Sequence, residues 1–346
     1  MSSAPESVLN VAVVGAGAFG RNHLRIYRDL EASGAPLHLA AIIERDSTLI
    51  SDLKRQHPGT QIFSSLEACL GANLRLDAAS VCVPTSSHHA AATALLNHRI
   101  DVLVEKPIAA NLDEADDLVR LAQSKARILQ VGHLERFNPA VLTAAPHIHR
   151  PMFFEAHRLS LFTPRSLDVD VVLDLMIHDL DVVLSFVDSP VRELHAVGLP
   201  ILSRKVDIAN VRVEFESGCI ANFTASRVST ERVRKLRFFQ PHQYVSIDYA
   251  RQDLLFIDVA ARTNADAPPT PASSDVAQPS GQLAIAKPPV EPGEPLRLEI
   301  EAFLRSVRQR STPVVSGADG RAALALALEI NAAIRKHASR AGLDRF

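Results

Sequence analysis

Short, nearly uncharged apolar runs alternate with amphipathic stretches over the first third of the chain. The apolar runs are rich in valine, isoleucine, leucine and alanine, as the buried strands of parallel sheets are: VLNVAVVGAG, LHLAAIIE, AASVCVP, DVLVEKP and ARILQVGH. The stretches between them have helical spacing: FGRNHLRIYRDLEA, SSHHAAATALLNH and NLDEADDLVRLAQSKA. Asn111 suits the N-cap position of the last of these helices. Strand–helix–strand alternation predicts an α/β domain with a parallel sheet between two layers of helices.

After residue 150 the alternation of apolar and polar positions has a period of two, which is typical of half-buried antiparallel strands. It runs through FFEAHRLSLF, VRELHAVGLPIL, IANVRVEFESGCIANFTASRVS, KLRFFQP, QYVSIDY and DLLFIDVA. The letters FESGCI carry a turn signal and predict a hairpin. An apolar helix over residues 170–187 would cover one face of the resulting sheet. This half of the chain is therefore predicted to be an α+β domain with a large, mostly antiparallel sheet.

A glycine-rich turn joins the first predicted strand to the first predicted helix. In VAVVGAGAFGRNHL, Gly15, Gly17 and Gly20 stand in G-x-G-x-x-G register, which allows a tight turn, close approach of a pyrophosphate and close helix–strand packing. The second strand ends in Glu44, where a carboxylate that binds a ribose hydroxyl belongs in this motif. That carboxylate favours NAD over NADP, whereas the neighbouring Arg45 could pair with a 2′-phosphate or cover the adenine. These features predict a dinucleotide-binding Rossmann domain.

These patterns divide the chain into three parts. We predict an NAD-binding Rossmann domain over residues 1–130 and a substrate and oligomerisation domain over residues 131–317. A C-terminal helix within residues 318–346 would pack back on the body. Residues 262–295 are dense in proline, alanine and serine, a composition that cannot build a core, and are predicted to form a mobile loop.

The composition excludes several classes of protein. A formal net charge of −2 gives no general electrostatic case for binding nucleic acid. The three cysteines are too few and too scattered for a disulfide framework or a zinc site. The adjacent histidines His88 and His89 would point about 100° apart on a helix, which argues against a metal site. The N-terminus lacks a signal-peptide pattern, and no apolar run reaches the roughly 18 residues of a membrane span. We expect a cytoplasmic protein.

The segment DLMIHDLD lies inside the apolar helix predicted over residues 170–187 and is unusually polar for a buried helix. Helical spacing places Asp174 and His178 on one side, with Asp181 one turn further on, while Asp179 points elsewhere. Histidine titrates near neutral pH, and an acid one turn away can orient it, so the pair is a candidate general base. The alternative is a hydrogen-bonded core histidine. Asp181 is either a structural partner or an acid on the helix face.

The motifs GAGAFGRNHL, VPTSSHHAAA, VLVEKPIA, VGHLERFNP and DLMIHDLD together resemble the Gfo/Idh/MocA (glucose–fructose oxidoreductase/inositol dehydrogenase) family over nearly the whole chain. The resemblance implies an NAD-dependent oxidoreductase. It places Lys106 beside the nicotinamide and on the substrate hydroxyl, and it places Asp174 and His178 in the sugar site. The family often has Gly-Gly shortly before the aspartate, whereas this chain has DVDVVLD, which bears on the shape of the sugar pocket.

The resemblance also implies sets of contacts. A diphosphate could be met by Arg158, Arg165, Arg204 and Lys205, although each alone fits an ordinary surface charge. The expected catalytic residues are Lys106, Asp174 and His178. The expected cofactor contacts are Gly15, Gly17, Ala18, Phe19, Gly20, Glu44, Arg45, Pro84, Thr85, His88, Glu105 and Lys106. The expected substrate contacts are Arg136, Asn138, Arg158, Arg165, Asp174 and His178.

One branch of the family is similar over longer stretches, including EAHRLSLFTPRSLDVDVVLDLMIHDLD and VDIANVRVEFESGCIANFTASRVS. These stretches look similar to UDP-N-acetylglucosamine 3-dehydrogenases, which implies oxidation of the sugar 3-hydroxyl to a ketone. An aminotransferase would then convert that ketone into an amine for lipid A. The alternatives are a dehydrogenase of a free polyol such as inositol and an NAD-binding regulator without catalysis. We expect a homodimer or homotetramer formed through the C-terminal sheet.

Overall fold

The computed structural model describes residues 7–162, 169–259 and 283–343, which form two compact units. Unit 1 comprises Met1–His133 and Leu296–Arg321, and unit 2 comprises Leu134–Pro295 and Ala322–Phe346. Within the parts of the chain that the structure describes, no helix is both long enough and apolar enough to cross a membrane.

Unit 1 contains a six-stranded sheet in the order β3-β2-β1-β4-β5-β6, with every neighbouring pair parallel. The strands are β1 (Leu9–Val14), β2 (Leu37–Ile43), β3 (Gln61–Phe63), β4 (Ala78–Val81), β5 (Asp101–Glu105) and β6 (Leu129–Gly132). This is the strand order of the Rossmann fold, as predicted. The sequence pattern had missed β3, because a three-residue strand is too short to show a period.

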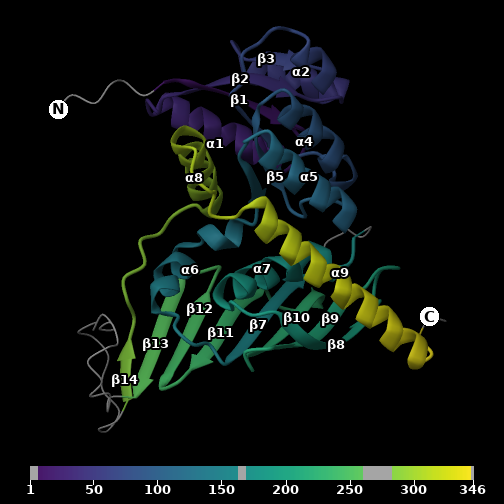
Figure 1. Cartoon of the computed structure of the whole chain (residues 1–346), viewed down its shortest axis with the longest axis vertical. Coiled ribbons are helices and arrows are strands. Elements are labelled where there is room, and N and C mark those ends of the chain that lie inside the picture. Colours follow the sequence, from purple (N-terminus) through teal and green to yellow (C-terminus); the bar gives the residue numbers. More distant parts are fainter. Residues whose placement is uncertain (1–6, 163–168, 260–282, 344–346) are drawn as a thin grey trace. The chain divides into compact units, whose positions relative to one another are not determined.

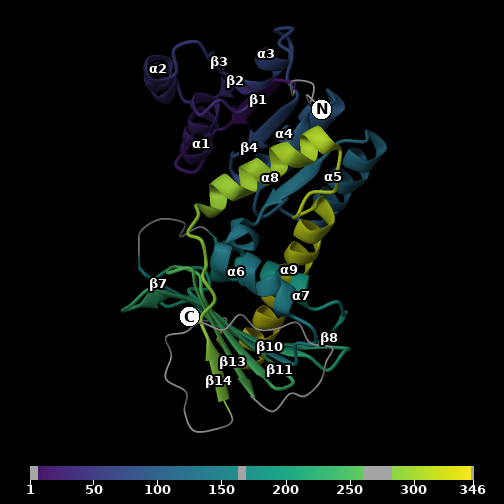
Figure 2. The same cartoon turned by 90° about the vertical axis from the view of Figure 1, so that its left-hand side faces the viewer.

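Helices lie on both faces of this sheet (Figure 2). They are α1 (Gly20–Ala32), α2 (Ser47–Gln56), α3 (Leu66–Leu70), α4 (His88–Asn97), α5 (Leu112–Ser124) and α8 (Pro295–Gln309), with the 3₁₀ helix η1 (Thr85–Ser87) before α4. Asn111 caps α5 as predicted, since its side-chain oxygen accepts from the Glu114 N–H at 3.0 Å. The segments that form α2 and α3 are not among the predicted helices.

The boundary predicted at residue 317 is wrong, because α8 belongs to unit 1. Its Ile300 and Phe303 are fully buried in one hydrophobic core with Leu24 of α1 and Leu103 of β5. The long helix α9 (Gly317–Arg340) begins in unit 1, and from Ala322 onward it belongs to unit 2. Position along the chain had suggested that α8 continued the second domain, but its apolar face packs on the first.

Unit 2 contains an eight-stranded sheet in the order β14-β13-β12-β11-β7-β10-β9-β8, antiparallel except for the pair β7–β10. The strands are β7 (Phe153–Leu161), β8 (Val191–Leu199), β9 (Ile208–Phe215), β10 (Ile220–Ser229), β11 (Val233–Gln240), β12 (Gln243–Asp248), β13 (Asp253–Val259) and β14 (Leu283–Ala286). The remaining elements are η2 (Leu134–Phe137), α6 (Pro139–Ala144), η3 (Ala145–His147), η4 (Val172–Met176) and α7 (Ile177–Phe186). One face carries α6, α7 and most of α9 (Figure 1). This confirms the predicted mostly antiparallel sheet.

The predicted structureless loop over residues 262–295 needs a correction at its C-terminal end. Leu283–Ala286 forms β14, which pairs antiparallel with β13 and buries Ala286. Four apolar residues next to a proline-rich stretch give no recognisable period, so the pattern could not reveal this strand. Residues 260–282, which hold most of the predicted loop, lie outside the described residues.

The predicted helix over residues 170–187 is present, but it is not a uniform α-helix. Val172–Met176 is a π-helical turn, and α7 follows it directly. Asp170 secures the start, because its carboxylate accepts from the N–H groups of Val172 and Leu173 at 3.0 and 2.9 Å. Single π-helical turns are rare and are frequently found at functional sites. Asp174 lies within this turn, and His178 lies just after it.

A buried ion-pair network connects α7 to the sheet. Arg158 of β7 donates from Nε and Nη2 to both carboxylate oxygens of Asp179, at 2.7 and 2.9 Å, and from Nη1 to Glu135 of η2 at 2.9 Å. The guanidinium also lies 5.1 Å from the centre of the Tyr249 ring. Arg158, Asp179, Glu135 and Tyr249 are all buried. Asn138 completes the network by donating to Glu135 Oε2 and to the Tyr249 carbonyl.

The charges in this network stabilise one another. Burial alone would lower the pKa of Arg158, but the Asp179 and Glu135 carboxylates outweigh that effect and hold its pKa well above the ordinary value. Burial, with the nearby charge of Asp179, raises the pKa of the Tyr249 hydroxyl well above its usual range. Arg158 is therefore expected to stay charged, and the Tyr249 hydroxyl to stay neutral, at neutral pH.

We predict that Arg158→Met lowers the stability of the protein strongly, although the two side chains have similar length. The change leaves the carboxylates of Asp179 and Glu135 buried without their cation, which typically costs about 3–5 kcal/mol. Urea unfolding followed by circular dichroism should show a clearly lower midpoint. The control is Arg192→Met, because Arg192 is exposed and pairs with Glu214 in water, where ion pairs contribute little. Equal midpoints for both variants would contradict the prediction.

Candidate active site

Unit 1 contains a cavity of about 550 Å³ at the carboxyl ends of its strands. Among the predicted cofactor residues, the structure brings Gly15, Gly17, Glu44, Arg45 and Pro84 together on its wall. These residues come from the turn after β1, the end of β2 and the loop after β4. In open α/β sheets, ligands bind at this edge.

The three glycines of the turn meet different requirements. Gly15 has a φ of +91°, and a Cβ there would lie 2.8 Å from the Cys82 carbonyl oxygen. At Gly20 a Cβ would lie 1.9 Å from the Gly15 carbonyl oxygen, so only glycine lets α1 start this close to the turn. A Cβ at Gly17 would meet no atom within 4 Å, and Gly17 lines the cavity. This open side is where a pyrophosphate can approach the backbone.

The helix after the turn begins without a side-chain cap. Phe19 occupies the N-cap position of α1 and makes no side-chain hydrogen bond there, whereas Asp46 caps α2 and Asn111 caps α5. An uncapped N-terminus offers N–H groups and the positive end of the helix dipole to an anion. The turn thus fits the diphosphate of a dinucleotide. Ala18 and Phe19 themselves are exposed at this turn.

Glu44 is held in place at the other end of the cavity. One of its carboxylate oxygens accepts from the Ala16 N–H at 2.8 Å and the other from the Asp46 N–H at 3.0 Å. A carboxylate has about four lone-pair positions, so Glu44 retains acceptor capacity for ribose hydroxyls. Asp46 and Glu67 also line the cavity, and Arg45 is the one cation among the described residues of its wall. This acidic surrounding disfavours the additional phosphate of NADP and fits NAD.

The cavity wall also contains residues that no sequence motif indicates. They are Asp46, Leu49, Ser64, Ser65, Leu66, Glu67, Ser87, Ala90, Ala91 and Ala94. Six of them belong to the segment from the end of β2 to α3, which the pattern left unassigned. The alanines belong to α4, where the small residues of HHAAATALLN could have indicated a face kept open for a ligand.

Glu105 lies elsewhere than predicted. Its carboxylate lies 2.9 Å from His23 Nε2 and packs closely over Gly132. His23 Nδ1 in turn lies 3.1 Å from the Ser80 hydroxyl, which is 2.8 Å from the Tyr27 hydroxyl. These four side chains form a buried polar chain beneath the glycine turn, so Glu105 supports the site from inside and does not line the cavity.

His88 also supports the site instead of facing the cofactor. It is buried, and its ring nitrogens lie 2.8 Å from the Pro107 carbonyl oxygen and 2.9 Å from the Val83 carbonyl oxygen. The imidazole thereby connects the loops after β4 and β5. Burial lowers its pKa, against the opposing effect of these two carbonyl groups. Lys106 follows β5 directly in the second of these loops, and Thr85 begins η1 in the first.

In unit 2 the structure changes the roles expected for two residues. Arg158 cannot meet a diphosphate, because its guanidinium is buried and bound to Asp179 and Glu135. Asn138 is also buried, and its side chain caps α6 by accepting from the Ala140 N–H at 3.1 Å. Both were expected to touch substrate, and both are structural. Arg165 lies outside the described residues.

The remaining predicted residues of unit 2 are on or beside α7. Arg136 pairs with the buried Asp181 at 3.6 Å, which identifies Asp181 as a structural partner. Asp179 is paired with Arg158, so two of the aspartates of DLMIHDLD hold the helix. Asp174 is half-buried in the π-helical turn, and the His178 side chain is largely buried on α7. This acid and imidazole stay the candidates for proton transfer.

We predict that Glu44→Gln narrows the preference for NAD over NADP. The amide keeps one oxygen, which can accept from one of the two N–H groups that Glu44 now binds, those of Ala16 and Asp46. The change removes the charge that repels a 2′-phosphate. The ratio of kcat/KM for NAD to that for NADP should fall by a factor of about ten or more, which corresponds to ~1.4 kcal/mol. Glu31→Gln on α1 is the control, since that carboxylate pairs with His38. An unchanged ratio in Glu44→Gln would rule out Glu44 as the discriminating group.

Comparison with protein families gives two matches. Residues 9–133 match the family described as "Oxidoreductase family, NAD-binding Rossmann fold". Residues 146–240 match the GFO/IDH/MocA C-terminal domain.

Individual relatives agree with this assignment. The UDP-N-acetylglucosamine 3-dehydrogenase of Acidithiobacillus ferrooxidans is 31% identical over 333 residues, covering 96% of this chain and 99% of that protein. Its solved structure superposes with a TM-score of 0.82, covering 94% of this chain and 98% of that one. The inositol 2-dehydrogenase of Mycolicibacterium smegmatis is 29% identical, over 55% of this chain and 56% of its own length. A levoglucosan dehydrogenase solved with NADH has the same fold, with a TM-score of 0.81, 16% identity and coverage of 95% and 98%. The chain belongs to the GFO/IDH/MocA family of NAD-binding oxidoreductases.

Proposed function

We propose that this protein oxidises the 3-hydroxyl of UDP-N-acetylglucosamine to a ketone with NAD. One observation carries the proposal: the match to a UDP-N-acetylglucosamine 3-dehydrogenase extends over 96% of the chain and so includes unit 2 as well as unit 1. The match to the inositol 2-dehydrogenase covers 55% of the chain. A polyol dehydrogenase is therefore the less favoured alternative. The presence of Lys106 and His178 speaks against a regulator that has lost catalysis.

The residues of the chain can be given roles in this reaction. Oxidising a secondary alcohol requires a proton to leave the hydroxyl oxygen while a hydride leaves the carbon that carries this hydroxyl. Bound NAD supplies the hydride acceptor. We assign His178 as the base that takes the proton, with Asp174 orienting the imidazole and stabilising its charged form. Lys106 is assigned to the oxygen, where its ammonium group would stabilise the developing alkoxide charge.

The substrate assignment is tested by incubating the purified protein with NAD and UDP-N-acetylglucosamine and following NADH absorbance. Mass spectrometry should find a product lighter than the substrate by two hydrogen atoms. With a nucleotide-sugar aminotransferase and an amino donor, the 3-amino sugar should appear, which is the form that would enter lipid A. Robust turnover of free inositol, with none of the UDP-sugar, would replace the proposal by the polyol alternative.

The catalytic assignment predicts that His178→Ala lowers kcat by a factor of roughly 10² to 10⁴, the range for lost general acid–base catalysis. NAD binding, measured by fluorescence titration, should stay close to that of the unchanged protein, because the dinucleotide cavity belongs to unit 1. His195→Ala is the matched control, because His195 is an exposed histidine of unit 2, the unit that also contains His178.

Lys106→Ala should also lower kcat. The double variant should lose less than the product of the two single effects if both groups act on one oxygen. Normal turnover by His178→Ala together with a lower melting temperature would make His178 a core residue.

Association of copies through the eight-stranded sheet also stays a prediction. Sedimentation of the purified protein measures the oligomeric state.

A further inference from the structure

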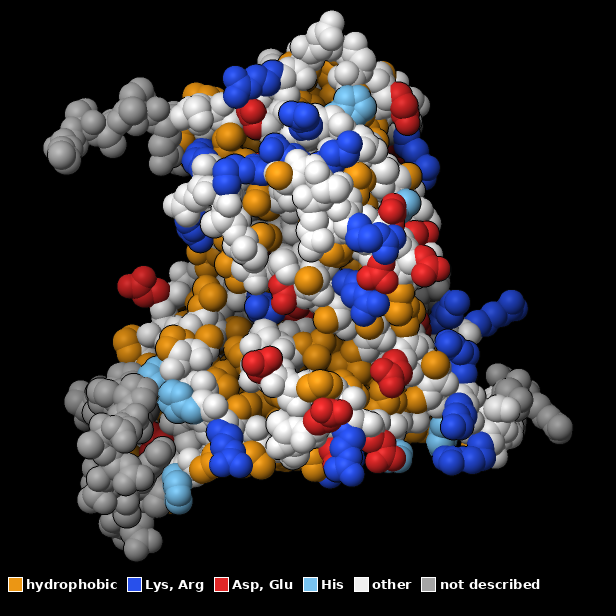
Figure 3. Space-filling model, viewed as in Figure 1, with side chains coloured by type: hydrophobic (Ala, Val, Ile, Leu, Met, Phe, Trp, Pro, Cys, Tyr) orange, Lys and Arg blue, Asp and Glu red, His pale blue; other side chains and the backbone are white. Residues whose placement is uncertain are grey.

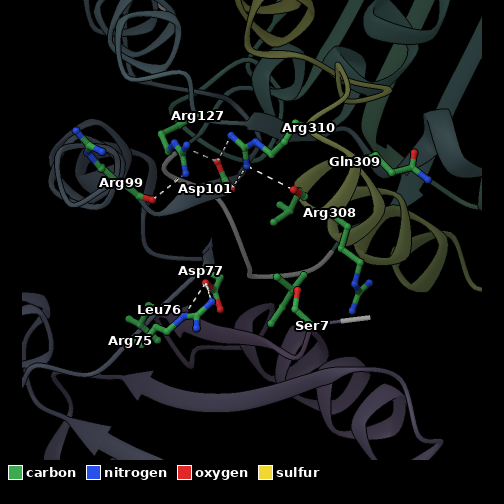
Figure 4. A pocket seen from close by; sticks show the side chains of 12 residues that line it. Ser7, Arg75, Leu76, Asp77, Arg99, Asp101, Arg127, Arg308, Gln309 and Arg310 are labelled. Atoms are coloured by element: carbon green, nitrogen blue, oxygen red, sulfur yellow. Dashed lines mark hydrogen bonds and ion pairs between the residues drawn. The ribbon is translucent and has the colours of Figure 1, made fainter. Parts of the chain in front are cut away.

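Unit 1 has a second cavity, of about 490 Å³, which shares no lining residue with the dinucleotide cavity. It lies where β1, β4 and β5 begin, whereas the dinucleotide cavity lies where the strands end. Its wall comes from the segments just before these strands and from the end of α8 (Figure 4). Neither the glycine motif nor the proposed reaction uses it.

The wall of this cavity is rich in arginine. Four guanidinium groups and two carboxylates line it, those of Arg75, Arg127, Arg308, Arg310, Asp77 and Asp101. Arg99 also lines it but turns its guanidinium away (Figure 4). On the face of the molecule in Figure 3, basic and acidic side chains are interspersed. The surplus of two positive charges in one hollow is therefore a local focus of positive potential.

Both carboxylates on the wall already accept hydrogen bonds from backbone N–H groups. Asp77 accepts from the Asn10 N–H at 2.8 Å, and Asp101 accepts from the Ile128 N–H at 2.7 Å. Asp101 also receives two hydrogen bonds from Arg310, at 2.5 and 3.2 Å. The carboxylates thus fasten the amino ends of the strands. Asp77 is also the ion-pair partner of Arg75, and Asp101 lies 3.8 Å from Arg127 Nε, so the two carboxylates are shared among three guanidinium groups, those of Arg75, Arg127 and Arg310.

Two of the arginines have donor capacity left. Arg75 uses Nε and Nη2 on Asp77, and Arg127 uses Nε and Nη1 on the carbonyl oxygens of Lys125 and Arg99. Among the bonds of the described residues, the third nitrogen of each guanidinium is unused. Guanidinium groups match phosphate oxygens in geometry and charge, and they bind them in pairs of hydrogen bonds.

The size and chemistry of the wall indicate the class of ligand. The volume is within the usual range for small-molecule sites. The described wall holds no aromatic side chain on which a base could stack, and its apolar part is limited to Leu9, Leu76 and Val307. We propose that this cavity binds a small phosphorylated anion of the pyrophosphate class, separately from the dinucleotide. The proposal is independent of the substrate assigned above.

The test is calorimetric titration of inorganic pyrophosphate into protein saturated with NAD, at constant ionic strength. Saturation with NAD keeps the glycine turn occupied, so that any binding reports on the second cavity. The test variant is Arg75→Gln/Arg127→Gln, which leaves Asp77 bound to Asn10 and Asp101 bound to Arg310. The control variant is Arg55→Gln/Arg120→Gln, which removes two exposed arginines of unit 1 that likewise pair with aspartates.

The proposal expects saturable binding of one pyrophosphate per chain. Affinity should fall at least tenfold in the test variant and stay unchanged in the control variant. NAD affinity and melting temperature without pyrophosphate should be similar in all three proteins. The absence of saturable binding, an equal loss in both variants, or an effect reproduced by sodium chloride at the same ionic strength would overturn it.

Discussion

The burial of one cation, the guanidinium of Arg158, fixes the helix that carries the candidate catalytic residues. It joins three elements that are distant in the sequence, β7, α7 and η2, through Asp179 and Glu135. Ion pairs in a protein interior persist only when the geometry is good and the remaining polar atoms are satisfied. Here Asn138 and the Tyr249 ring meet that requirement. Because Asp179 is the neighbour of His178 in sequence, the same contact restrains the helix backbone that carries the imidazole.

In unit 1, polar side chains likewise hold the site in place, through hydrogen bonds to backbone groups. Glu44 holds the backbone of the glycine turn and of the residue before α2, and His88 holds the loops after β4 and β5. Each of these polar side chains is occupied by backbone groups before any ligand arrives. Such preorganisation lowers the conformational entropy that binding must overcome. The dinucleotide cavity is thus shaped by residues that are themselves held by hydrogen bonds.

The ionisable residues of DLMIHDLD on the buried helix form two groups, and each group has its own explanation. Asp179 and Asp181 are bound to arginines and hold the helix, which is the structural alternative. Asp174 and His178 sit at the change from π- to α-helical geometry, where the proposed chemistry places the base. A single sequence motif thus combines a scaffold with a candidate site. This explains how such a helix tolerates four ionisable groups in eight residues, DLMIHDLD.

Features that depend on neighbours along the chain can be predicted from the order of residues. The parallel strands of unit 1, the Asn111 cap, the glycine turn and the acid at the end of β2 all follow from local spacing and from steric limits on a few residues. The same holds for the period of two in unit 2. Short elements such as β3 and β14 escaped, because three or four residues do not show a period.

Contacts between segments far apart in the chain determine which polar side chains face a ligand and which hold the fold. Arg158, Asn138, Glu105 and His88 have residue types that suit a binding site, yet each is occupied by partners that are up to 111 positions away in the sequence. The same applies to α8, whose apolar face packs on a sheet formed by the first part of the chain. A side chain's role is set by the groups that meet it in the interior, and a one-dimensional pattern does not contain those pairings.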